Sequence, residues 1–198
     1  MFFKMSVLKK LMKNAYKGGC LVLGDSMEGY VIASGWWSIW INKEYTPKEL
    51  KAAIIELCGE LPFGEWFRAS SSMGNQGMMP FEDSVHPVHL FNNSKEPVNI
   101  TRILMTKGES LMRLLQNEET KEVSAISEVI LNLIDEKTIK EEDGEYPPIG
   151  PITMDNGVFS WGNNICYLSV YPIKLLDEAK EDEKIQFFKE LKELSVPV

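Results

Sequence analysis

The chain has 198 residues, which is enough for one large domain or two small ones. Hydrophobic residues make up 44% of it and charged residues 25%, a balance that is typical of globular proteins and excludes wholesale disorder. Its three cysteines lie far apart in the sequence and argue against a disulfide framework. No apolar run approaches the roughly 18 residues of a membrane span, so we expect a cytoplasmic protein without membrane contact.

The net charge of −8 is distributed unevenly along the sequence. Residues 1–24 contain five lysines and no acidic residue, which leaves a net charge of −13 for the rest of the chain. Four of these lysines interrupt the apolar N-terminal stretch, so it does not fit a signal peptide. A basic segment on an acidic body is compatible with a local contact to phosphate, and equally with an ordinary solvated helix face.

Two helices are predicted in the first third of the chain. The first spans residues 6–16, where apolar residues recur at helical spacing, and two glycines end it. The second begins where Thr46 and Glu49 fit a capping box around Pro47, and Gly59 ends it.

Between these helices the sequence predicts a short buried strand (CLVLG), a turn (DSMEG) and a long strand from Tyr30 to about Asn42. The long strand contains three of the five tryptophans. Alternation places Val31 and Trp37 on the core face, and Tyr30, Trp36 and Trp40 on the opposite face. We expect this second face to be covered; if it is open, its aromatic rings form a partner or stacking surface.

The rest of the chain predicts further strands and helices. Residues 61–97 are rich in Gly, Pro, Ser and Asn, which indicates loops and short edge strands and a natural place for a binding segment. "VNITRILMT" predicts a strand, "ESLMRLLQN" a short helix, and "KEVSAISEVILNLIDEKTI" a strand or short helix. A hairpin is expected to turn at Gly162-Asn163-Asn164, and a terminal helix at residues 176–194.

An internal duplication is also a hypothesis. "SVLKKLMKN" (residues 6–14) aligns without gaps with "ESLMRLLQN" (residues 109–117), and strand-like sequence follows each. Amphipathic helices also resemble one another by chance, so the alignment leaves both explanations open.

"LVLGDSMEG" (residues 21–29) resembles the nucleophile block of the GDS-type (SGNH) serine esterases. On that resemblance Ser26 is the nucleophile, Asn75 an oxyanion donor, and Asp83 and His86 the supporting pair. Two features oppose it. The family places its Asp-x-x-His near the C-terminal end of a parallel α/β fold, and it follows its serine with a helix.

Both histidines of the chain, His86 and His89, lie in "EDSVHPVH" beside Glu82 and Asp83. They could share a metal ion with a carboxylate, but Pro87 excludes a helix that would align them, and in a strand they would face opposite ways. We therefore expect loop histidines and no metal. No GxxxxGK[ST] or GxGxxG motif is present, so we expect no cofactor.

A second resemblance concerns the order of the predicted elements. The first helix, "CLVLG", "GYVIASGWWSIWINKE" and "TPKELKAAIIELCGELP", with the later "YPPIGPITMDNGVFSWGNNICYLSVYPIKL", are similar to small proteins of phages and mobile elements of Gram-positive bacteria. Those proteins look like relatives of the DNA sliding-clamp fold. The similarity covers residues 5–62 and 146–175.

The clamp resemblance implies repeated helix-plus-strands units, with lysine-bearing helices towards DNA. The matching positions are Lys9, Lys10 and Lys13 on the first helix and Arg113 on its possible repeat. Contacts of this kind are independent of DNA sequence and sensitive to salt. One chain of this length cannot encircle a duplex, so encirclement would need a homo-oligomer.

We therefore expect an α+β fold, with antiparallel β-sheet and helices packed mainly on one face, and more specifically a clamp-like arrangement of two helix-plus-strands units. We expect residues 1–198 to form a single domain, which could consist of two pseudo-repeats (5–97 and 98–198). The expected function is that of a non-enzymatic intracellular protein that binds double-stranded DNA or a DNA-processing or defence protein. The alternatives are an acidic DNA mimic that inhibits a nucleic-acid-binding protein, and an SGNH-like serine esterase.

Overall fold

The computed structural model describes residues 1–139, 145–153 and 157–173, so the predicted terminal helix lies outside the described residues. The first elements are α1 (Met5–Lys17), β1 (Leu21–Ser26), β2 (Gly29–Ala33), β3 (Trp37–Asn42), α2 (Lys48–Cys58), β4 (Trp66–Ser70) and β5 (Gly74–Met78). The later elements are the 3₁₀ turn η1 (Asp83–Val85), α3 (Pro87–Asn93), β6 (Glu96–Lys107), β7 (Ser110–Asn117), β8 (Val123–Ser127), α4 (Glu128–Leu133), the 3₁₀ turn η2 (Glu136–Thr138), β9 (Ile149–Thr153), β10 (Phe159–Gly162) and β11 (Cys166–Val170).

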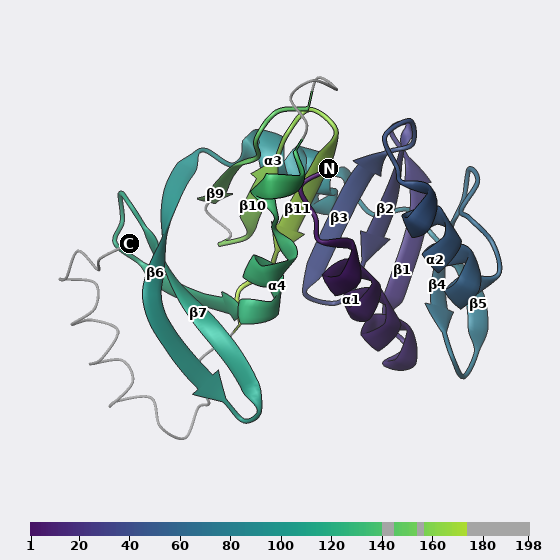
Figure 1. The fold of residues 1–198 in the computed structure, drawn as a ribbon, viewed down its shortest axis with the longest axis horizontal. Coiled ribbons are helices and arrows are strands. Elements are labelled where there is room, and N and C mark those ends of the chain that lie inside the picture. The colour runs from purple at the N-terminus through teal and green to yellow at the C-terminus, as the bar shows by residue number, and fades with distance from the viewer. Residues whose placement is uncertain (140–144, 154–156, 174–198) are drawn as a thin grey trace.

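The described strands form one antiparallel sheet of eleven strands in the order β5-β4-β1-β2-β3-β11-β10-β9-β6-β7-β8. The expected α+β class with antiparallel strands is therefore confirmed. The C-terminal strands β9–β11 lie in the middle of the sheet, between the strands of the first half and β6 (Figure 1). None of the described helices is both long and apolar enough to span a membrane.

A helix followed by a three-stranded meander occurs twice, and the two units meet at the centre of the sheet. α1 precedes β1–β3, α4 precedes β9–β11, and β3 pairs with β11 from Trp37 opposite Val170 to Ile41 opposite Cys166. The two helices contact each other on one face of the sheet (Figure 1). The helix of the second unit is therefore α4, and not residues 109–117, which the sequence alignment matches with α1.

The main core lies between one face of the sheet and helices α1, α2 and α4. Its fully buried side chains include Leu8 and Met12 from α1, Leu50 and Ile54 from α2, Ile130 and Leu133 from α4, and Leu23, Ile32 and Ile39 from the sheet. A smaller cluster around Val31, Trp40 and Trp66 lies on the opposite face, where Val88 of α3 packs against it. Three of the four described helices thus pack on the same face, as the sequence predicts.

The tryptophan-rich segment forms two strands and not the single long strand that we predicted. The chain reverses at residues 34–36, where the N–H of Ser34 donates to the carbonyl of Trp37 at 2.8 Å. The reversal places Val31 in the smaller cluster with Trp40, so its predicted position on the core face with Trp37 was wrong. The Ser-Gly dipeptide at positions 34 and 35 is an ordinary turn signal that explains the break.

"ESLMRLLQN" forms strand β7, and the predicted helix was wrong. A two-residue turn with Gly108 at φ 61° joins Lys107 to Ser110, and this turn starts a long hairpin with β6. Leu114 and Leu115 are fully buried in β7. Pairing with β6 and β8 therefore overrides the helix propensity of a leucine-rich segment.

Helix α2 ends as predicted but begins differently. Its N-cap residue is Pro47, and the Thr46 hydroxyl donates to the carbonyl of Asn42 at 2.8 Å, so the predicted capping box with Glu49 does not form. At the other end Gly59 adopts the left-handed conformation with φ 83°, which closes the helix.

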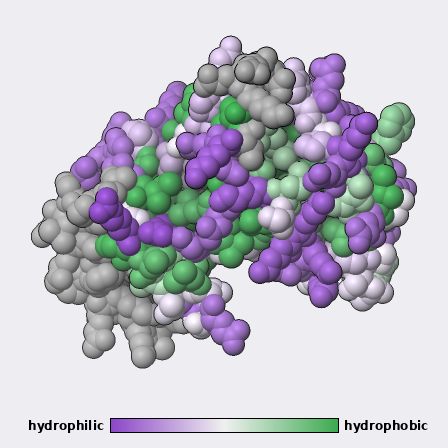
Figure 2. All heavy atoms as spheres, in the orientation of Figure 1, coloured by the Kyte–Doolittle hydropathy of each residue, from purple (hydrophilic) through white to green (hydrophobic). Residues whose placement is uncertain are grey.

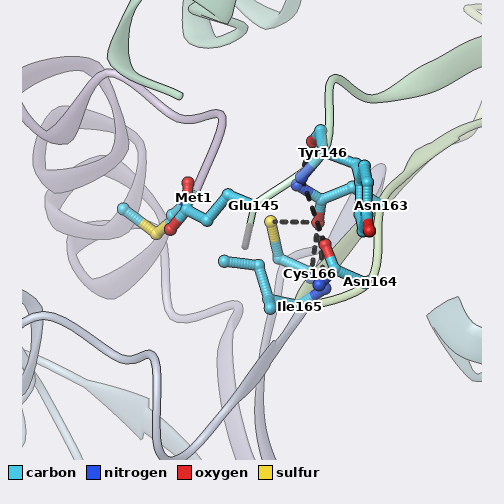
Figure 3. A network of polar contacts seen from close by, with 7 residues as sticks. All are labelled: Met1, Glu145, Tyr146, Asn163, Asn164, Ile165 and Cys166. Carbon is cyan, nitrogen blue, oxygen red and sulfur yellow. Dashed lines mark hydrogen bonds and ion pairs between the residues drawn. The ribbon is translucent and has the colours of Figure 1, made fainter. Parts of the chain in front are cut away.

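The predicted hairpin at residues 162–164 is confirmed, and Asn163 organises it. The side-chain carbonyl of Asn163 accepts the N–H groups of Ile165 and Cys166, each at 3.0 Å, as Figure 3 shows. Its amide donates to the carbonyl of Tyr146 at 2.8 Å. One buried side chain thus fixes the β10–β11 turn and the segment that leads to β9.

Candidate nucleic-acid interface

Helix α1 combines a buried apolar face with an exposed row of lysines. Leu8, Leu11 and Met12 are at most 5% exposed, and their packing in the main core turns the opposite side of the helix outward. The exposed side carries four lysines of the helix, with a fifth just before it: Lys9, Lys10, Lys13, Lys17 and Lys4. α1 contains no acidic residue. We call the four helical lysines the α1 lysine row.

The geometry of the α1 lysine row follows from helix periodicity. Lys9, Lys13 and Lys17 are four residues apart, so neighbours lie on one side with a rise of about 6 Å between them. None of the row forms an ion pair with a described residue. Figure 2 shows hydrophilic side chains gathered over α1 and α2 on this side of the molecule. The sequence prediction included Lys9 and Lys13 but missed Lys17, although the four-residue spacing could have identified it.

Arg113 lies on strand β7 and not on a helix, and its guanidinium is engaged within the protein. Nη2 and Nε donate to the two carboxylate oxygens of Glu128 at 2.7 and 3.0 Å, and Nη1 donates to the carbonyl of Thr101 at 3.3 Å. The hydrogen bonds to Glu128 raise the pKa of Arg113 above its usual value. Because this charge is neutralised by a neighbour, Arg113 does not extend the α1 lysine row as the resemblance implied.

A cleft of about 600 Å³ lies beside the Arg113–Glu128 pair, between β6, β7 and α4. Its lining combines four cationic with three anionic side chains: Lys4, Arg102, Arg113 and Lys137 with Glu128, Asp135 and Glu136. The opposing charges nearly cancel. The cleft therefore lacks the excess positive charge of a phosphate-binding groove, in contrast to α1.

The aromatic residues that could have formed a stacking surface are largely covered. Trp40 is 7% exposed and Tyr30 9% exposed. The indole N–H of Trp40 donates to the carbonyl of Ser26 at 2.9 Å, and its ring contacts that of Tyr167 at 5.6 Å. Trp36 is half-buried at the turn and packs against the main core. The expectation of a covered face is confirmed for Trp40. Tyr30 is also buried, but it lies opposite Ile41 on the face of the main core, so its predicted position beside Trp40 was wrong. The open stacking surface was wrong for both.

The residues of the esterase hypothesis lie in a different setting from the one the resemblance implies. Ser26 ends β1 and a tight turn leads directly into β2, where the esterase family has a helix. Every described strand pairing is antiparallel, in contrast to the family's parallel sheet. The amide of Asn75, on β5, donates to the carbonyl of Cys58 at 2.8 Å and to Glu60 at 2.9 Å. It is therefore engaged at the end of α2.

The two histidines are not arranged as a catalytic pair. His86 is 2% exposed, and its Nδ1 accepts the N–H of Val88 at the start of α3. Burial, with the nearby His89, lowers the pKa of His86 to about 4. The Asp83 carboxylate lies 3.7 Å from Nε2 of His89 and does not orient His86. A weakly basic imidazole without an orienting carboxylate is a poor general base.

The same residues do not form a metal centre. Nε2 of His86 and of His89 are buried without a hydrogen-bond partner. Within the part of the chain that the structure describes, however, no three His, Cys, Asp or Glu side chains are placed to hold a metal ion. The α1 lysine row is therefore the arrangement with the clearest chemical use.

Comparisons with known proteins found no match: no family model fits the sequence, and no curated protein and no solved structure is significantly similar to it.

Proposed function

We propose that this protein binds double-stranded DNA without sequence preference, through phosphate contacts made by the α1 lysine row. The observation that carries the proposal is a set of four exposed lysines on a helix that is held outward by its buried face and contains no acidic residue. These ammonium groups pair with no described carboxylate, so they can replace the counterions condensed on a duplex without losing an internal ion pair.

The negative charge of the rest of the chain restricts the proposed DNA contact to the side that carries α1. Residues beyond position 24 carry a net charge of −13, which repels a polyanion. DNA is thus attracted to one side of the molecule only. This favours a local contact through α1 over wrapping of DNA around the protein.

The resemblance to sliding-clamp relatives supports the proposal in one respect. In that fold, lysine-bearing helices over antiparallel strands face DNA, and here the lysine-bearing α1 packs over a sheet that contains the antiparallel strands β1–β3. A clamp-like arrangement of α1 and α4 is part of this proposal. In contrast to α1, α4 contains no lysine or arginine, so only one helix of the pair supplies cations.

The proposal is tested by titrating a fluorescently labelled duplex of arbitrary sequence and following anisotropy at increasing salt. With four phosphate contacts, log Kd plotted against log salt concentration should have a slope of about 3.6, so affinity falls about 150-fold between about 50 and 200 mM salt. A second duplex of unrelated sequence should bind equally well. No binding at low salt would overturn the proposal and favour the acidic DNA-mimic alternative.

Charge reversal locates the contact. Lys10→Glu with Lys13→Glu should abolish or strongly weaken binding and lower the salt slope by about two. The matched control is Arg68→Glu with Lys95→Glu, which makes the same change in net charge at exposed positions on β4 and just before β6. If both double variants lose affinity equally, general electrostatics and not α1 accounts for binding. Circular dichroism checks that each variant remains folded.

A further inference from the structure

The two edges of the sheet differ in what lies against them. At the β8 edge, Ile173 forms a bridge with Ala125, and its N–H donates to the Ala125 carbonyl at 2.8 Å. At the opposite edge, β5 pairs with β4 and with no other described strand. Every second backbone N–H and C=O of β5 therefore points outward, and such an edge is a template for another extended chain.

Strand β5 lacks the features that usually protect an edge. Its sequence, GNQGM, contains no charged residue and no proline, and four of its five residues are exposed. Met73, directly before the strand, is 62% exposed, and Met79, directly after it, is 82% exposed. Both methionines are three residues from Gln76, so the exposed apolar side chains are placed symmetrically about the centre of the strand.

We propose that β5 pairs antiparallel with β5 of a second copy of this chain, around a two-fold axis at Gln76. In this register Met73 lies opposite Met79 of the second copy at both ends of the pair, so all four exposed methionines become partly buried. Asn75 lies opposite Gly77 of the second copy. The same strand serves both subunits, which is the requirement of a closed two-fold interface.

The chemistry of the strand favours a copy of itself as the occupant. Residues of like charge that face each other across a strand pair destabilise it, and a neutral strand avoids this on self-pairing. Gln76 lies opposite Gln76 of the second copy, and two amides can both donate and accept. Two charged residues lie close to the strand: Glu60 accepts a hydrogen bond from Asn75, and Arg68 is beside Gln76 on β4. Three strand spacings, about 14 Å, separate Arg68 from its copy, which is more than the screening length of about 10 Å at 0.1 M salt.

The interface is small, so the dimer should be weak. One five-residue strand pair with four methionines buries less than the about 1,200 Å² of standard interfaces. Sedimentation velocity over a concentration series should show the average mass rising from 22.5 kDa towards twice that value. A protein that stays monomeric up to the highest soluble concentration would overturn the proposal.

Charge variants at the axis test the register. Gln76→Lys and Gln76→Glu should each weaken self-association by up to about fivefold, because two like charges then lie opposite each other. An equimolar mixture of the two variants should associate again. Thr106→Lys, at an exposed position on β6, is the matched control and should dimerise like the unmodified protein. Self-association that Gln76→Lys leaves unchanged would show that another surface is used.

Cross-linking gives an independent readout. Gln76→Cys places two thiols opposite each other on the axis, so mild oxidation should yield a covalent dimer, whereas Thr106→Cys should not. The native cysteines are half-buried or buried, which keeps the background low. Equal yields for both variants would contradict the proposed axis. The dimer does not depend on DNA binding, and all these measurements are made without DNA.

Discussion

At the residue scale, two strand glycines are explained by the tryptophans that lie over them. A Cβ atom at Gly24 would lie 2.2 Å from the ring of Trp66, and one at Gly29 would lie 2.2 Å from the ring of Trp40. The indole rings thus occupy the space that side chains would need on the neighbouring strand. Both rings belong to the smaller cluster, so this close approach fixes how that face packs.

Gly24→Ala is therefore expected to destabilise the protein by about 1–3 kcal/mol, because the added methyl group must displace a buried indole. The free energy of unfolding from urea titration measures the effect. Gly77→Ala is the control, since a Cβ there meets no atom within 4 Å. Its effect should stay within about 0.5 kcal/mol, and an equal loss in both variants would contradict the steric explanation.

His86 should make stability depend on pH. Burial lowers its pKa to about 4 from an ordinary value of 6.5, so the unfolded chain takes up the proton first as the pH falls. The stability that neutral His86 contributes is complete above about pH 6.5 and is lost progressively as the pH falls towards 4. The loss amounts to about 3 kcal/mol.

The measurement is the free energy of unfolding at several pH values between 4 and 7, compared with His86→Asn. Asparagine can still accept a hydrogen bond at the start of α3 but does not titrate. The difference between the two proteins isolates His86 from the carboxyl groups that titrate in the same range. Parallel curves would show that His86 is not responsible for the pH dependence.

At the element scale, the sequence predicts best those elements whose signals are local. The first helix was predicted at residues 6–16 and spans Met5–Lys17, since its apolar spacing and the glycines after it agree. The end of α2 at Gly59 and the hairpin at Asn163 were also predicted, because glycine and asparagine have specific conformational roles there. The α1 lysine row follows from the same spacing.

The elements predicted wrongly are those decided by distant contacts. Residues 109–117 have a leucine-rich composition that suits a helix, but strands on both sides make them β7. Trp37 and Trp40 were correctly placed on opposite faces, whereas Val31 was not, because a turn at residues 34–36 reversed the alternation. The pairing of Arg113 with Glu128 could not be predicted, because this contact joins β7 to α4 and depends on the three-dimensional fold.

That ion pair leads to a prediction about its elements. Arg113 and Glu128 are 20% and 18% exposed and share two hydrogen bonds, so a double-mutant cycle with alanine should give a coupling of about 1–2 kcal/mol. Unfolding titrations of the four proteins supply the value. Arg113→Ala should leave the salt slope of DNA binding unchanged. A lower slope would mean that Arg113 contacts phosphate after all.

At the scale of the whole molecule, the position of β9–β11 could not be predicted from the sequence. These strands follow β6–β8 in the chain but lie between them and β3. Each pairing is an ordinary antiparallel one, so no local signal distinguishes this order from a simple succession of hairpins. The consequence is a sheet whose centre is built from both ends of the chain, with α1 and α4 side by side over it.

One core spans this sheet, and the molecule should therefore unfold as a single unit. Val98 of β6, Leu115 of β7 and Ile126 of β8 belong to the same cluster as Leu8 of α1. The N-terminal segment adds a second connection. The N–H of Lys4 donates to the carbonyl of Leu133 at 2.8 Å, and Phe3 bridges to Ile134. Neither half can open without exposing apolar surface of the other.

The distribution of tryptophans allows a direct test of single-unit unfolding. All five lie outside β6–β8, so fluorescence reports on the other strands, whereas far-UV circular dichroism reports on the whole chain. The two urea transitions should coincide. Phe2→Ala, at a fully buried position beside α4, should shift both together by about 3–5 kcal/mol. Only a shared core makes distant strands lose stability together when one buried ring is removed. Separate midpoints, or a shift of one signal alone, would therefore mean that β6–β8 unfold as an independent unit.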